Sequence, residues 1–164
     1  MERPKHNIHL SRIEWALEVA GAIGLIMTFV LIVLNYSDLP QIMPRHFNVS
    51  GKPDGYSSKE LLWILPTITL LIYTLMTIGS RFPHKFNYPL EITMENAKRQ
   101  YGNSVMMMRV LKTIIVIIFF YLTFAIIQIG LGKVNGIGTY FLPIFLIAVF
   151  GTVGVFLYRG NRMK

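Results

Sequence analysis

Residues 16–34 read ALEVAGAIGLIMTFVLIVL, an apolar run in which Glu18, near the start, is the one charged residue. Three more apolar runs contain no Asp, Glu, Lys or Arg: Leu61–Ile78, Ile114–Ile129 and Tyr140–Leu157. Each of the four has roughly 16–20 residues, and a helix crosses the hydrocarbon layer of a bilayer with about 20. Because a soluble domain does not carry four such runs in 164 residues, the sequence predicts an all-α integral membrane protein with four transmembrane helices.

We expect one membrane domain that covers residues 1–164. The predicted helices are 14–35, 58–79, 110–130 and 139–158, with an outer loop at 36–57 and an inner amphipathic helix at 93–109. The first apolar run is longer than the core of about 7–15 residues that a cleaved signal peptide has, and no small-residue cleavage pattern follows it. The first run is therefore predicted to be a retained membrane helix.

Composition excludes several kinds of site. The chain has no cysteine, so disulfides, thiolate catalysis and cysteine-bound metals are excluded, and no cofactor is expected. The net charge of +8 would indicate a nucleic-acid partner in a soluble protein. In a membrane protein the same charge follows from basic cytoplasmic loops. The expected partner is therefore the lipid bilayer, and no nucleic acid.

Lysine and arginine are distributed unequally between the two sides of the predicted helices. Most lie in the N-terminal segment, the second loop and the C-terminal tail: Arg3, Lys5, Arg12, Arg81, Lys85, Lys98, Arg99, Arg109, Lys112, Arg159, Arg162 and Lys164. The other side holds Arg45, Lys52, Lys59 and Lys133. Since basic loops remain in the cytoplasm, both termini are predicted to be cytoplasmic and the outer loop to face away from it. The predicted location is the inner membrane of a bacterium.

Two acids lie at the start of the first helix. We interpret Glu14 and Glu18 as residues favoured by the helix N-terminus rather than as a functional carboxylate pair. No other acid, base or histidine is expected inside a span. Ion-coupled and proton-coupled transporters carry such residues along their pathway, so this expectation argues against a pump.

Small residues predict close helix packing. Ala16, Ala20 and Gly24 recur every four residues in the first helix, and Gly151 and Gly154 lie in the fourth. Such spacing lets helix backbones approach each other in lipid. Packing within one chain is the preferred interpretation, and a homo- or hetero-oligomer through the same faces is the alternative.

The polar stretch Leu39–Glu60, LPQIMPRHFNVSGKPDGYSSKE, separates the first two runs. Its prolines restrict the backbone, and SGKPDG is a strong turn signal because Gly51 and Gly55 can take positive φ. Ser57 and Glu60 fit a capping box for the second helix, and Pro66 is expected to kink that helix. We therefore expect an ordered loop that packs on the outer ends of the helices.

Three polar side chains of this loop are candidates for a site. His46, Asn48 and Asp54 could converge on an extracytoplasmic ligand, or could bond to turn backbone in a purely structural loop. His46 and Asp54 are also candidate metal ligands, but a zinc site needs three or four. No metal site is therefore predicted.

The inner segment around NAKRQYGNSVMMM predicts an interfacial amphipathic helix that begins after an N-cap at Thr93. Its basic residues Lys98 and Arg99 would meet anionic lipid. Asn96 and Tyr101 are candidates for a secondary cytoplasmic binding site.

The outer loop resembles the signature of a bacterial membrane domain of unknown function that occurs in Sdp-type immunity proteins, which protect cells from a secreted killing peptide. The matching residues are Leu39, Pro40, Pro44, His46, Phe47, Asn48, Gly51, Pro53 and Asp54. The segment ITMENAKRQY is also similar to one in small members of the group. Immunity proteins of this type are longer, with further membrane helices after the shared domain, so the resemblance favours the domain assignment over the immunity role.

The sequence and the resemblance together predict a membrane protein that recognises an extracytoplasmic ligand through Leu39–Tyr56. The ligand would be a peptide or an envelope component, in toxin immunity or envelope-stress signalling. The expected ligand-binding residues are His46, Phe47, Asn48, Gly51, Pro53 and Asp54. One alternative is a small membrane enzyme or metal-dependent factor at the outer face, although an enzyme is disfavoured. The other alternative is a structural subunit of a membrane complex.

Overall fold

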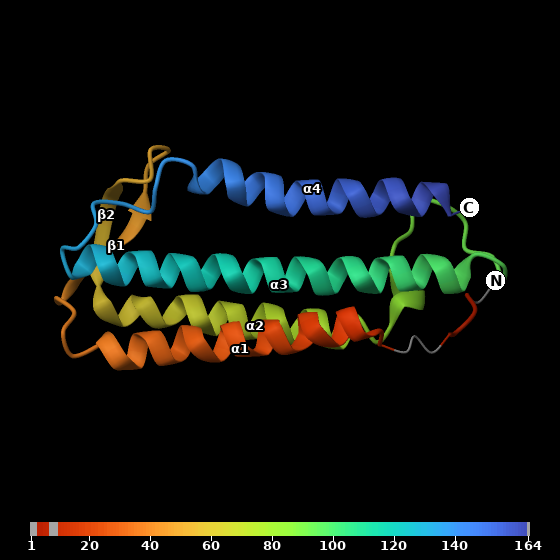
Figure 1. The fold of residues 1–164 in the computed structure, drawn as a ribbon, viewed down its shortest axis with the longest axis horizontal. Helices are drawn as coiled ribbons and strands as arrows, with labels where there is room; N and C mark the ends of the chain where they lie inside the picture. Colours follow the sequence, from red (N-terminus) through yellow and green to blue (C-terminus); the bar gives the residue numbers. More distant parts are fainter. Residues whose placement is uncertain (1–2, 7–9, 164) are drawn as a thin grey trace.

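In a computed structural model of the chain, residues 3–6 and 10–163 are described, and they form an elongated bundle (Figure 1). The helices are α1 (Arg12–Asn35), α2 (Ile64–Gly79), α3 (Ala97–Gly130) and α4 (Phe141–Arg162). Short 3-10 helices η1 (Lys59–Trp63) and η2 (Pro83–Lys85) flank α2. In the figure α3 lies between α4 and the pair α1 and α2, and both termini lie at one end. We call this the termini end.

The prediction of four membrane helices is confirmed at this level. Among the described residues, four helices are long and apolar enough to cross a membrane: Arg12–Asn35, Lys59–Gly79, Ala97–Gly130 and Phe141–Arg162. Large apolar side chains are exposed along them, including Ile23, Leu71, Ile117 and Ile147. Exposed apolar surface of this extent suits contact with lipid, as in a multi-pass membrane protein.

The outer loop contains a small sheet that the all-α prediction lacks. Strands β1 (Ile42–Phe47) and β2 (Pro53–Ser58) pair antiparallel at the end opposite the termini, which we call the hairpin end (Figure 1). Their register shifts on both sides of His46. Each strand contains a proline, which has no N–H to donate to a sheet and therefore argued against strand structure. Both strands are edge strands, however, where a missing N–H is tolerated.

The start of the second span also differs from the prediction. The N-cap of η1 is Ser58, without a side-chain capping bond, so the predicted capping box of Ser57 and Glu60 is wrong. Pro66 lies in the first turn of α2, because this helix begins at Ile64. The N–H groups of a first turn have no acceptor within the helix, so the proline removes no helical hydrogen bond there.

One helix replaces two predicted segments at the termini end. The predicted amphipathic helix 93–109 and the predicted span 110–130 are parts of α3, which has 34 residues. One buried face continues along it through Ala97, Tyr101, Val105 and Val116. Gly102 does not interrupt the helix, because the buried residues on both sides of it pack against the same bundle.

Glycines in α1 allow it to approach α3 closely. A Cβ at Gly24 would lie 2.8 Å from Cγ1 of Val116, and one at Gly21 would lie 3.0 Å from Cε2 of Tyr73. The predicted packing role is confirmed for Gly24, with Gly21 beside it, but not for Ala16 and Ala20, which are exposed. It is wrong within this chain for Gly151 and Gly154, where an added Cβ would meet no neighbouring atom within 4 Å.

Candidate functional site

The hairpin is anchored in the apolar core at its own end of the bundle. Leu39 and Met43 are buried there together with Ile32 of α1 and Ile127 of α3. Phe47 packs against this cluster from the edge. Burial of apolar side chains contributes about 1.5–3 kcal/mol each, so the base of the hairpin is held firmly on the helices.

The turn between the strands is closed by its own polar groups. Oδ1 of Asn48 accepts hydrogen bonds from the backbone N–H of Ser50 at 2.9 Å and of Lys52 at 3.1 Å. The N–H of Gly51 donates to the backbone oxygen of Asn48 at 2.8 Å. Gly51 has φ +74°, as the sequence predicted, and residues with a Cβ rarely adopt this conformation. Asn48 therefore has a structural task in this turn.

The turn also docks on the connection between α3 and α4. The N–H of Ile137 donates to the backbone oxygen of Gly51 at 2.8 Å. A Cβ at Gly51 would lie 2.5 Å from the backbone oxygen of Gly138, and a Cβ at Gly136 would collide with the backbone oxygen of Gly51. Glycine at both positions lets the two backbones touch. The hairpin is thus fixed at its base and at its tip.

His46 and Asp54 form the exposed polar pair of the hairpin. Nδ1 of His46 lies 2.5 Å from Oδ1 of Asp54 across the two strands. The histidine side chain is 71% exposed and the aspartate side chain 42%. Pairing with the carboxylate orients the imidazole ring, so both groups are presented to solvent in a defined geometry.

The structure therefore separates the predicted ligand-binding residues into two groups. His46 and Asp54 meet on the surface, whereas Phe47, Asn48 and Gly51 hold the hairpin in place. Pro53 begins β2 opposite Phe47. Within the described part of the chain, no third His, Cys, Asp or Glu joins His46 and Asp54 to make a group that could hold a metal ion.

Asn96 and Tyr101, the predicted secondary site, have structural contacts. Asn96 is the N-cap of α3, accepts from the N–H of Thr93 at 2.9 Å and donates to the backbone oxygen of Glu91 at 3.0 Å. Tyr101 is fully buried, with its ring 5.7 Å from that of Tyr88. Burial raises the pKa of the neighbouring Tyr88 phenol. The N-cap is thus Asn96 and not Thr93. Thr93 lies in the preceding turn and donates its N–H to the Asn96 side chain.

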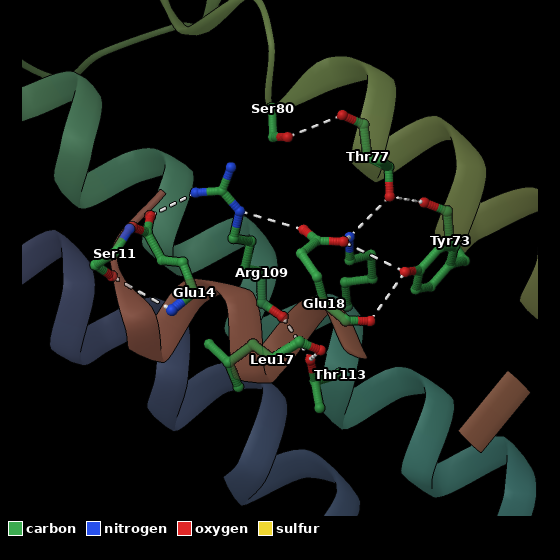
Figure 2. A network of polar contacts seen from close by, with 10 residues as sticks. Ser11, Glu14, Leu17, Glu18, Tyr73, Thr77, Ser80, Arg109 and Thr113 are labelled. Atoms are coloured by element: carbon green, nitrogen blue, oxygen red, sulfur yellow. Dashed lines mark hydrogen bonds and ion pairs between the residues drawn. The ribbon is translucent and has the colours of Figure 1, made fainter. Parts of the chain in front are cut away.

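A buried network of charges joins three helices near the termini end (Figure 2). Arg109 of α3 bonds to Glu14 through Nη1 and to Glu18 through Nε, the latter at 3.2 Å. Nζ of Lys112 lies 2.6 Å from Oε2 of Glu18 and 2.7 Å from Oγ1 of Thr77 in α2. Two acids of α1 are thereby matched by two bases of α3.

Tyr73 of α2 completes the network. Its hydroxyl lies 3.1 Å from the backbone oxygen of Glu18 and 3.3 Å from the carboxylate oxygen Oε2 of the same residue. The ammonium group of Lys112 lies 4.4 Å from the centre of the Tyr73 ring, within reach of a cation–π interaction. Each charged group thus has at least one partner on another helix (Figure 2).

The network lies at one edge of the candidate membrane spans, with Glu18 and Lys112 on the inner side of this edge. Glu18 is about 25 Å along α1 from Asn35, and Lys112 is about 27 Å along α3 from Gly130, at about 1.5 Å per residue. The hydrocarbon layer is about 30 Å thick. Arg109 and Lys112 are almost fully buried, with 6% and 1% of their surface exposed.

These positions correct two expectations. Glu14 does cap α1, because it exchanges hydrogen bonds with Ser11 in a capping box, but it also bonds to Arg109. Glu18 is an interhelical ion-pair partner, and Lys112, which the charge count assigned to the second loop, is buried inside α3. The expectation that the spans hold no further ionisable group is wrong. The signal was present in the sequence, since acids four apart and bases three apart each share one helix face.

Comparison with known proteins agrees with the predicted domain of unknown function. Residues 23–70 match the family model "Domain of unknown function (DUF1648)", a range that contains the whole hairpin. An uncharacterised protein of Archaeoglobus fulgidus is 38% identical over 76 residues, which cover 42% of this chain and 40% of that protein. This chain thus matches less than half of the length of that relative. No solved structure matches.

The pairing of Glu18 with Lys112 predicts a strong coupling between the two residues. Glu18→Gln or Lys112→Met alone leaves a buried charge short of a partner, which lowers the free energy of unfolding by about 3–5 kcal/mol. The double variant should lose less than the sum of the two, by at least about 1 kcal/mol. Denaturant titration of the protein in detergent measures all four states. Lys98→Met, at an exposed position on α3, is the control, and additive losses would contradict the pairing.

Proposed function

We propose that this chain is a multi-pass protein of a bacterial cytoplasmic membrane that recognises an extracytoplasmic ligand through the segment Leu39–Tyr56. The observation that carries the proposal is the His46–Asp54 pair, which is exposed on a hairpin that is fixed at both ends. A ligand that meets such a hairpin does not have to order it, so little conformational entropy is lost on binding.

The division of tasks among the signature residues supports this proposal. Leu39, Asn48 and Gly51 are explained by packing and turn geometry. The exposed pair contributes little burial to the fold, so stability alone gives no strong reason for a histidine and an aspartate there. Polar residues on an ordered loop that the scaffold does not need are typical of binding.

The surface near the pair suits an amphipathic peptide. Ile42, Val49 and Tyr56 are exposed apolar or aromatic side chains on the same hairpin, which also exposes the basic residue Arg45. His46 and Asp54 add a donor and an acidic group. A secreted, membrane-active peptide would offer complementary apolar and polar groups, and the resemblance to immunity proteins favours this ligand class.

The open position of the pair favours binding over catalysis. An acid–base reaction is most effective where water is excluded, whereas His46 is mostly exposed. The bundle's termini end carries many basic residues, including Arg81, Arg99 and Arg159, which favours a cytoplasmic location for this end. The hairpin would then face the outside of the cell, where a secreted peptide arrives.

Substitution of the pair tests this function directly. His46→Ala and Asp54→Ala should abolish protection of a peptide-sensitive strain against a secreted killing peptide, with a melting temperature in detergent within about 2 °C of the parent. Lys52→Ala, an exposed neighbour on the same turn, is the control that should keep protection. Gly51→Val should lose both protection and stability, because its Cβ collides with Gly138.

Three results would contradict the proposal. If the variants at positions 46 and 54 melt many degrees early, the pair is structural. If the parent protein gives no protection against any secreted peptide, the peptide class is wrong, and full protection by the variants would remove the pair from recognition.

The proposed orientation is tested with single cysteines, since the chain has none. Ser50→Cys on the hairpin and Arg99→Cys near the start of α3 both replace exposed residues. A membrane-impermeant maleimide added to intact cells should label position 50 and spare position 99, and lysis should make both reactive. Labelling of position 99 in intact cells would reverse the orientation.

A further inference from the structure

A cavity of about 640 Å³ lies between α1 and α2 at the termini end, beside the charge network. We infer that it binds a phosphate-bearing anion, and that its occupant is the headgroup of an anionic phospholipid. This inference concerns the opposite end of the bundle from the hairpin and does not depend on the proposed function. Residues that line the cavity and carry the argument are His6, Trp15, Glu18, Arg81 and Arg109.

Arg109 has a terminal nitrogen that makes no hydrogen bond to another residue in the described part of the chain. Its Nε and Nη1 atoms bond to Glu18 and Glu14, but no described residue accepts a hydrogen bond from Nη2. In Figure 2 this third nitrogen points away from both carboxylates. A guanidinium group carries five N–H donors, and this one is 6% exposed. An anion in the cavity, whose wall includes Arg109, would accept a charge-assisted hydrogen bond from this nitrogen.

His6 provides a second, independent unpaired group on the same wall. Its Nε2 atom is buried and has no hydrogen-bond partner among residues 3–6 and 10–163. Its ring centre is 6.3 Å from that of Tyr101. A buried ring nitrogen without a partner and a guanidinium nitrogen on the wall of the same cavity indicate a ligand that offers several oxygen atoms.

The balance of charge around the cavity selects an anion. Glu14 and Glu18 are matched by Arg109 and Lys112 in the ion pairs of the network. Arg81 also lines the cavity, and it is exposed. The wall therefore carries one positive charge more than its acids neutralise, and arginine is well suited to phosphate oxygens.

The position of the cavity favours a lipid as the source of the phosphate. The cavity lies near the membrane edge, at the depth of Glu18, and Trp15 on its rim is exposed, as tryptophans at headgroup level are. Leu10 and Ala22 add an apolar part to the same wall. Basic pockets between membrane helices hold anionic headgroups in this way, and acyl chains would continue along the exposed side of α1.

Lipid titration of the delipidated protein tests the site. In a neutral detergent we expect dioleoyl-phosphatidylglycerol to raise the melting temperature in a saturable manner, and dioleoyl-phosphatidylcholine to have no such effect. Arg81→Gln should raise the apparent Kd for phosphatidylglycerol about tenfold, the effect of losing one charge-assisted hydrogen bond. Arg99→Gln removes an exposed charge of α3 that does not line the cavity, and should leave Kd unchanged.

Inorganic phosphate, titrated in parallel, separates the two sources of the anion. If phosphate alone stabilises the protein as well as the lipid does, with the same loss in Arg81→Gln, the lipid assignment is overturned and a free anion is the ligand. Equal weakening by Arg81→Gln and Arg99→Gln would show diffuse surface attraction and would overturn the site. Equal stabilisation by the two phospholipids would do the same.

Discussion

The pairing of two acids on α1 with two bases on α3 is the interaction on which the arrangement of this protein depends. A single charged residue near the centre of a membrane helix costs about 2.5–3.5 kcal/mol on insertion scales, and more where it stays unpaired. Arg109 and Lys112 are buried at the membrane edge, and the partly buried Glu18 forms ion pairs with both. Because an ion pair tolerates little displacement, the pairing fixes how far α1 can slide along α3. Lys112 also bonds to Thr77, which brings α2 into the same register.

Packing toward the hairpin end follows from this register. One turn beyond Glu18, Gly21 and Gly24 let α1 contact α2 and α3 closely, and further along the same helices Ile32 meets Ile127 and Met43. The long helix α3 thus runs without a break from the charge network, to which it contributes Arg109 and Lys112, to the core beneath the hairpin. The surface that presents His46 and Asp54 therefore rests on the same rigid helix that holds the charges.

Much of this fold could be predicted from the sequence, because the bilayer imposes a length and a composition on each span. The four membrane helices and the positive φ of Gly51 were accessible in this way. The buried ion pair of Lys112 was indicated only by its spacing from Arg109, because a lysine at the end of an apolar run is typical of a loop until its partner is known. Pairing depends on which helix faces are adjacent, and that is a property of the tertiary structure.

The hairpin illustrates the same limit at the other end. Its prolines and glycines correctly predicted a turn, but they also argued against the two short strands that flank it. These strands are stabilised by the hydrogen bond from the N–H of Ile137 to the turn. The sequence also could not show which residues of the hairpin hold it in place and which form the exposed pair. Asn48 and His46 are both polar residues typical of binding sites. Their different tasks become visible only when the partner of each side chain is known.

The central claim, that charge pairing sets the register of α1 on α3, is tested most directly by disulfide cross-linking. Gly24→Cys together with Val116→Cys places two thiols close together, since the Cβ of position 24 would lie 2.8 Å from the present Cγ1 of Val116. We predict rapid oxidation of this pair in membranes, little oxidation when Ile117→Cys replaces Val116→Cys, and a clear loss of the 24–116 cross-link when Glu18→Gln is added. An unchanged rate of 24–116 cross-linking in the Glu18→Gln background would contradict the claim, because apolar packing alone would then set the register.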